Sequence, residues 1–321
     1  MAPVILDPDG SRAQLVLVGG LVIAVGLVAL AIVLNSGIYT HNLASRADPI
    51  ASEAVGSAVV VDDSVEGLVE FAVRDDPNDN DAQNATVEAG VPDISAQLSR
   101  ESARRGVLTN ATVVALFPGT TVRQTADREF SDGASPANPS WEVADDAHGI
   151  RDFRMDVDRS SLTDRGLLSF PISSTVFNVT FQTLPDDVVV SVYQDSGTTA
   201  VLVTDEATGR MFGPCTDSTG SRTEIDLTGA TVAGEHCAAL ERLGDLPRPY
   251  DVEFDGGDRA VGTYSLVANT TETPAGTVGS PGDSGPSGLD TLYSVRVDVR
   301  FQSHRVDYRT NVTAAPGEPD G

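Results

Sequence analysis

The chain has 321 residues, of which 47 are acidic and 21 are basic, so its formal net charge is −26. This length leaves room for one large or two small globular domains. A protein that binds nucleic acid needs a basic surface, and this acidic balance excludes nucleic acid as the partner.

All 21 basic residues are arginine, and lysine is absent. A chain this acidic repels itself at low ionic strength, but molar salt shortens the screening length to about 3 Å and removes that repulsion. An acidic, lysine-free composition is typical of proteins from salt-loving organisms. We therefore interpret the chain as a halophilic, haloarchaeal protein.

Near the N-terminus, Leu15–Leu34 contains no charged, amide or hydroxyl side chain and no proline. A helix of this length spans roughly 30 Å, which matches the hydrocarbon core of a bilayer. The sequence therefore predicts one transmembrane helix over residues 14–34, behind a short head at residues 1–13. Arg12 is the only basic residue of the head, which favours a cytoplasmic N-terminus and an extracellular C-terminal domain.

The junction before this helix resembles the processing site of archaeal prepilin-type leaders. Such sites have a charged residue, then Gly or Ala, then a polar residue that opens the apolar run; here these are Arg12, Ala13 and Gln14. The resemblance implies cleavage after Ala13. Many type IV pilins carry a Glu where this chain has Val18, so an unprocessed signal anchor remains the alternative.

After the span, the pattern predicts an amphipathic stalk helix within residues 35–74. Asp48-Pro49 reads as its N-cap, and apolar residues then recur every three or four positions up to Ala72. Residues 75–106 are expected to hold an exposed loop, Asp75–Asn84, and a short helix, Ile94–Arg105, capped by Asp93.

From residue 107 to residue 315 the hydrophobic period changes to two. Short segments rich in Val, Thr, Phe and Tyr alternate with Gly, Pro, Asp and Ser turns, and two pairs, at residues 188–204 and 295–312, read as hairpins. The expected fold class is α+β, mainly β, with an antiparallel sandwich-like ectodomain. Residues 270–290 read as a flexible loop within it, and residues 316–321 as a frayed tail.

Two kinds of modification site are suggested in this β-rich region and just before it. The only cysteines, Cys215 and Cys237, either form a disulfide or remain free thiols, since no metal-binding or redox spacing is present. Five Asn-x-Thr sequons suggest surface glycosylation, at Asn84, Asn110, Asn178, Asn269 and Asn311.

No pattern predicts a catalytic residue, a cofactor or a metal site. Gly282-Asp283-Ser284-Gly285-Pro286 resembles the nucleophile motif of chymotrypsin-like proteases, with His236 and one of Asp245, Asp251 or Asp255 as partners. One glycine is missing, and the serine lies in a low-complexity loop that cannot fix a nucleophile and an oxyanion hole. Four acidic runs are interpreted as solvated turns, with a cation site as the less favoured alternative. They are Asp75–Asp81, Asp145-Asp146, Asp186-Asp187 and Asp255–Asp258.

The apolar helix, its prepilin-like junction and the β-rich region together resemble an uncharacterised haloarchaeal family of single-span, type IV pilin-like membrane proteins. The resemblance rests on Arg12–Arg46 and Thr291–Gly321. It implies a non-enzymatic, membrane-anchored surface protein: a minor pilin or a pilus-associated component. Its partners would be the lipid bilayer and other pilin-like single-span proteins, contacted through the transmembrane helix. The alternative is a membrane-tethered extracellular module that binds a cation or a glycan.

Overall fold

The computed structural model describes residues 49–134, 137–165, 175–277 and 285–318. The chain divides into two units, Met1–Gly56 and Ser57–Gly321, and both sheets belong to the second. The predicted transmembrane helix and the processing site Arg12-Ala13-Gln14 lie outside the described residues. Within the part that is described, no helix combines the length and apolarity needed to cross a membrane.

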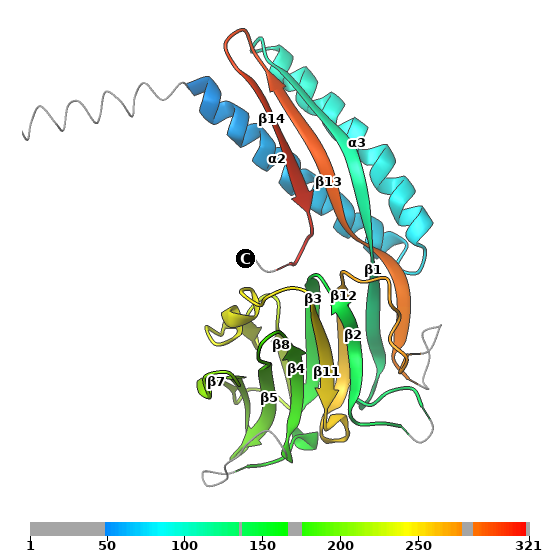
Figure 1. Ribbon diagram of the computed structural model, residues 1–321, viewed down its shortest axis with the longest axis vertical. Helices are drawn as coiled ribbons and strands as arrows, with labels where there is room; N and C mark the ends of the chain where they lie inside the picture. Colours follow the sequence, from blue (N-terminus) through cyan, green and yellow to red (C-terminus); the bar gives the residue numbers. More distant parts are fainter. Residues whose placement is uncertain (1–48, 135–136, 166–174, 278–284, 319–321) are drawn as a thin grey trace, which may run out of the picture. The chain divides into compact units, whose positions relative to one another are not determined.

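Within the described residues, two long helices precede the sheets (Figure 1). Helix α2 runs from Pro49 to Asp75 and α3 from Asn80 to Ala103. The predicted exposed loop, Asp75–Asn84, is therefore too long. The turn lies between Asp75, where α2 ends, and Asn80, where α3 begins. Asp79 is the N-cap of α3, since its carboxylate accepts a hydrogen bond from the backbone N–H of Ala82.

Helix α3 thus begins 14 residues before the predicted short helix, and Asp93 lies inside it rather than at its cap. Pro92 also lies inside α3. A proline removes one helical hydrogen bond and normally ends a helix. Here the buried side chains of Val87 and Val91 before the proline, and of Ser95 after it, anchor the helix on both sides, so tertiary packing outweighs the local penalty.

In the part of the chain that the structure describes, fourteen strands form two antiparallel sheets. The larger sheet has the order β10-β9-β8-β3-β12-β1-β13-β14, and the smaller has the order β2-β11-β4-β5-β6-β7. The described connections contain the short 3₁₀ helices Arg159–Ser161, Leu240–Leu243 and Gly257–Arg259. In chain order the strands are β1 Leu108–Glu129, β2 Trp141–Ala147, β3 Ile150–Asp158, β4 Phe177–Gln182, β5 Val188–Asp195, β6 Thr198–Asp205, β7 Arg210–Asp217, β8 Arg222–Asp226, β9 Thr231–Val232, β10 Glu235–His236, β11 Tyr250–Asp255, β12 Val261–Ala268, β13 Ser287–Gln302 and β14 Asp307–Ala314.

The mainly β, α+β fold class is confirmed, as are the two predicted hairpins, β5–β6 and β13–β14. The sequence pattern missed β2, β7 and β10. Strand β7 is an edge strand that carries Gly213-Pro214 and is largely exposed, so it shows neither an alternating pattern nor strong β propensity.

Two expectations about flexible segments are corrected. The predicted loop 270–290 ends earlier, because β13 already begins at Ser287 and pairs there with Arg123 of β1. The tail is held at least to Glu318, whose carboxylate forms an ion pair with Arg248. The carbonyl of Pro316 also accepts a hydrogen bond from the Arg151 guanidinium at 3.3 Å. Strand pairing accounts for the first correction and side-chain contacts for the second, and composition reveals neither.

Strand β1 connects two differently packed regions of the second unit. Its second half pairs with β12 and β13, but residues 108–119 pair with β13 alone. We call this three-stranded part, residues 108–119 with Thr291–Gln302 of β13 and all of β14, the ribbon. Helices α2 and α3 cover one face of the ribbon and share with it a core of aliphatic side chains, among them Val65, Val91 and Val297.

Beyond the ribbon the two sheets face each other as a sandwich. Their inward side chains form one core with an aromatic centre. There Phe130, which follows β1, and Tyr264 of β12 contact Phe254 of β11 at centroid distances of 5.9 and 5.0 Å. Trp141 is buried in this core and donates its indole N–H to the carbonyl of Phe130. The single tryptophan is therefore a core anchor.

Candidate functional site

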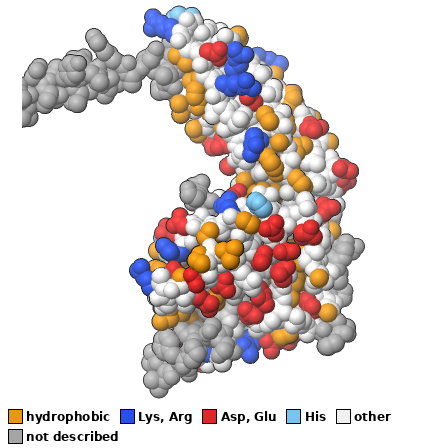
Figure 2. All heavy atoms as spheres, viewed as in Figure 1, with side chains coloured by type: hydrophobic (Ala, Val, Ile, Leu, Met, Phe, Trp, Pro, Cys, Tyr) orange, Lys and Arg blue, Asp and Glu red, His pale blue; other side chains and the backbone are white. Residues whose placement is uncertain are grey.

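The outer face of the smaller sheet carries a row of carboxylates. Because side chains alternate along a strand, Val252 and Phe254 of β11 point into the core while Asp251, Glu253 and Asp255 point outward. These three lie opposite Gln182, Thr180 and Asn178 of β4, respectively. We call this surface, together with Glu142 and Asp145 of β2, the acidic face; red side chains gather here in Figure 2.

Three of its carboxylates converge at one end. Oxygen atoms of Glu142, Asp145 and Asp251 all lie within 4.8 Å of one another. The backbone N–H of Asp146 also donates to the Asp251 carboxylate at 2.7 Å. Irregular register between β2 and β11 brings Asp145 to the same side as Glu142.

The carboxylates of Glu142, Asp145 and Asp251 lie close enough to repel one another, and two of their pKa values are raised. Partial burial and the neighbouring charges of Asp145, Asp251 and Glu253 raise the pKa of Glu142 above its ordinary value. Burial and the Asp251 carboxylate likewise raise the pKa of Asp145. Oxygen ligands at this spacing suit a hard cation such as Ca²⁺, which would relieve the repulsion.

Next to this group, the acidic face is hollowed by a pocket of about 550 Å³ between β11, β4 and β5. Its lining is polar: the Gln182 amide donates to Glu253 at 2.7 Å, and the Thr180 hydroxyl donates to Asp255 at 3.3 Å. Partial burial and Asp255 raise the pKa of Glu253. Amides, hydroxyls and carboxylates side by side offer both donors and acceptors, which is the chemistry that recognises the hydroxyl groups of a glycan.

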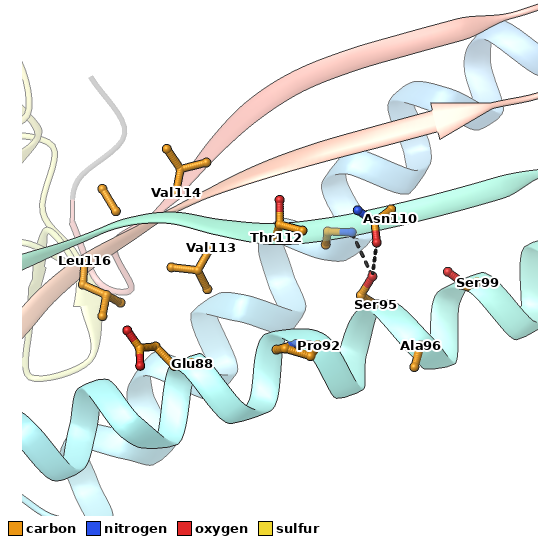
Figure 3. A pocket seen from close by; sticks show the side chains of 12 residues that line it. Glu88, Pro92, Ser95, Ala96, Ser99, Asn110, Thr112, Val113, Val114 and Leu116 are labelled. Carbon is orange, nitrogen blue, oxygen red and sulfur yellow. Dashed lines mark hydrogen bonds between the residues drawn. The ribbon is translucent and has the colours of Figure 1, made fainter.

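A second hollow, of about 690 Å³, lies between α3 and the start of β1 (Figure 3). At one end α3 touches the strand, because the Ser95 hydroxyl accepts from the backbone N–H of Ala111 and donates to Asn110. Toward the other end Pro92 and Glu88 lie across from Val113 and Leu116. This groove carries one charged side chain and suits an apolar partner better than a polar ligand.

The five sequons differ in accessibility. Asn110 and Asn311 are exposed, and Asn84 and Asn269 are half-buried. Asn178 is only 4% exposed, and its side-chain oxygen accepts a hydrogen bond from the Ser191 hydroxyl at 2.7 Å. A glycan on Asn178 would have to replace this packed arrangement, so the structure argues against the sequon that lies in β4.

Cys215 and Cys237 form a disulfide, with their Cα atoms 5.8 Å apart. It ties the edge strand β7 to the segment that follows β10, and Cys237 is buried in the sandwich core. The sequence left open a disulfide or two free thiols, and the structure has the disulfide.

The protease-like constellation is not assembled in the described residues. Gly282, Asp283 and Ser284 lie outside them, and His236 is exposed on β10. The carboxylate nearest its Nε2 atom is that of Glu241, at 3.4 Å. In the structure as described, Asp245, Asp251 and Asp255 form no ion pair with this histidine.

Among the acidic runs, Asp187 accepts a hydrogen bond from the N–H of Thr183 in a turn, and Asp255-Gly256 ends β11, as expected of turns. Asp145-Asp146, in contrast, belongs to strand β2. Glu142 and Glu253 were not among the residues predicted from the sequence. The alternation Asp251-x-Glu253-x-Asp255 was the available signal for a one-sided acidic strand.

Comparison with known proteins adds one match. Residues 9–136 fit the model of a family of unknown function, DUF7261, which covers the predicted span, both helices and β1. Neither the curated proteins nor the solved structures contain a match.

Proposed function

We propose that this protein is a non-enzymatic, membrane-anchored cell-surface protein of pilin-like architecture, either a minor pilin or a pilus-associated component of a salt-loving organism. Leu15–Leu34 would cross the membrane once, with the N-terminus in the cytoplasm and the β-rich domain outside. The anchor would also offer smooth helix faces, such as Gly19 and Gly26, to other single-span proteins.

One observation carries this proposal. The helix that follows the apolar run, α2, buries its apolar stripe against an antiparallel sheet, including Val61, Val65 and Val69. An N-terminal apolar helix that continues into a helix packed on a β-sheet is the arrangement the pilin resemblance implies. A predicted leader junction at Arg12-Ala13-Gln14 agrees with it.

The test is mass spectrometry of the intact chain from its native membrane. A chain that begins at Gln14 is expected if a prepilin-type peptidase recognises the junction. A chain that retains residues 1–13 would refute processing and leave a plain signal anchor. Protease treatment of intact cells separately tests the topology, because an extracellular β-rich domain must be cleavable from outside.

The alternative is a membrane-tethered binding module, favoured by the polar pocket on the acidic face. Its ligand would be a glycan in the pocket of Gln182, Glu253 and Asp255, or a cation beside it. Calorimetry of the full chain in detergent at high salt, with CaCl₂ and with neutral oligosaccharides, tests this. A Gln182→Ala variant should lose glycan binding and keep any calcium response, and silence with both ligands would refute the module.

A further inference from the structure

The charge of the second unit is distributed unevenly, and one end of it is basic. This end comprises residues 100–112, which are the end of α3 and the start of β1, and residues 298–311, which are the β13–β14 hairpin. It holds six arginines and three acidic residues, a net charge of +3, in a chain whose net charge is −26. The six arginines are Arg100, Arg104, Arg105, Arg300, Arg305 and Arg309.

Strand register places these segments together. Arg300 of β13 pairs with Asn110 of β1 on one side and with Arg309 of β14 on the other. The end of α3 joins them, since the Ser99 hydroxyl donates to the carbonyl of Thr109 and the Thr109 hydroxyl donates to Ser102. In Figure 2 a group of blue side chains lies at this end of the ribbon, while the red side chains of the acidic face lie in the lower part of the view.

The arginines of this basic end remain accessible to solvent even where they form ion pairs within the unit. Arg104, Arg300 and Arg309 contact Glu101, Asp307 and Asp298, but their side chains remain 81%, 52% and 73% exposed. Arg100 and Arg305 are exposed and have no ion-pair partner within the described residues. Helix-dipole stabilisation could explain Arg100 and Arg104 at the end of α3, but not the arginines of the hairpin.

Exposed apolar side chains lie at the same end. Leu108, the first residue of β1, is 62% exposed. Val59 and Val60 of α2 are 53% and 47% exposed. They reach this end because α2 and α3 are antiparallel: Leu68 lies against Gly90, so nine residues further along Val59 lies level with Ser99.

Basic side chains combined with exposed aliphatic ones are the signature of a surface that rests on a membrane. The guanidinium group matches a phosphate because its N–H groups form two parallel hydrogen bonds to it. These contact bonds survive salt better than long-range attraction does.

Chain connectivity selects the membrane over other anionic partners. Only 14 residues, 35–48, separate the predicted span from α2, and fully extended they reach about 50 Å. The chain enters the second unit at Ser57, which by the same antiparallel count lies level with Glu101 at the basic end. The part of the domain nearest the bilayer along the chain is therefore this basic end.

On the assumption of the membrane anchor proposed above, we infer that the basic end of the second unit docks on the anionic phosphate headgroups of the membrane that holds the anchor. This contact orients the domain so that the acidic face points away from the anionic surface. The occupant is a lipid phosphate layer, contacted by the arginines, with Leu108, Val59 and Val60 at the headgroup boundary.

The test uses the full chain with one free thiol, introduced as His304→Cys in the hairpin; both native cysteines are in the disulfide. The thiol carries an environment-sensitive fluorophore, and the protein is reconstituted into phosphatidylcholine vesicles with or without phosphatidylglycerol. We expect a blue-shifted signal, quenched by headgroup-labelled quencher lipid, only when phosphatidylglycerol is present.

The variant Arg100→Gln/Arg305→Gln should lower the docking equilibrium about 25-fold, at about fivefold per arginine. The matched control Arg210→Gln/Arg242→Gln removes the same charge from the region of β7, and should leave docking unchanged. Circular dichroism of each variant checks that it folds.

Vesicle flotation separates the two proposals. A protein that does not float with the vesicles refutes the anchor itself. A protein that floats but gives the same signal with and without phosphatidylglycerol refutes the docking. A signal that is independent of lipid and rises with protein density would assign the basic end to the acidic face of a second copy, and would also overturn the inference.

Discussion

Gln83 offers the sharpest test of how the helices are held on the ribbon. Its side chain is completely buried in α3. Its amide oxygen accepts hydrogen bonds from the Leu292 N–H at 2.7 Å and from the Thr291 hydroxyl at 3.1 Å, both in β13. Its amide nitrogen donates to the carbonyl of Asp76, in the turn between α2 and α3, at 2.7 Å.

Replacing Gln83 with Met keeps the volume and removes all three bonds. The buried N–H of Leu292 then has no partner, which costs about 1–3 kcal/mol, and the other two bonds add about 1 kcal/mol each at most. We expect a loss of roughly 2–4 kcal/mol. For a domain of this size that lowers the melting temperature by about 2–4 °C per kcal/mol.

The measurement is urea unfolding of the full chain in detergent at fixed high salt, with amide hydrogen exchange to locate the effect. Exchange should accelerate in α3 and in β13 around Leu292, and less in the sandwich strands. Gln97→Met, at an exposed position of the same helix, is the control and should change stability by less than about 0.5 kcal/mol. Equal effects of the two substitutions would refute the reasoning.

Three further predictions concern the sandwich. Burial would raise the pKa of Asp217, but hydrogen bonds from Thr219 and Thr223 and the charge of Arg159 lower it instead, so its carboxylate stabilises the fold at neutral pH. That contribution should fade as pH falls through the lowered pKa, which would appear as a fall in the urea unfolding midpoint. Asp217→Asn should abolish this pH dependence and cost about 3–5 kcal/mol, because the buried Arg159 charge then loses its carboxylate partner. On the acidic face, Asp251→Asn should bring the raised pKa values of Glu142 and Asp145 down toward ordinary ones, as carboxyl NMR titration would reveal; unchanged values would contradict the like-charge explanation. Reducing the Cys215–Cys237 disulfide, which closes a 22-residue separation, should cost about 3 kcal/mol in unfolding measured with and without reductant, whereas no difference would mean that β7 is held without it.

Local sequence patterns predicted much of the secondary structure of this protein. Period-two hydrophobicity predicted most strands and both hairpins, because each strand buries one face regardless of its partner. The three- and four-residue spacing of apolar residues predicted the stripe of α2. Composition predicted an acidic surface, and the uncharged run Leu15–Leu34 carries the membrane hypothesis without any structure.

Tertiary structure decided what depends on residues far apart in the chain. Gln83 lies in a stretch that reads as an exposed acidic loop, and only the neighbouring β13 makes it a buried residue. Glu142 and Asp251 are 109 positions apart, and the pairing of β2 with β11 brings them together. The basic end arises in the same way, because the arginines of α3 and of the hairpin meet only through the register of β1 with β13. Hydrophobic periodicity reports which face of an element is buried, whereas the charge of a surface depends on which elements share it.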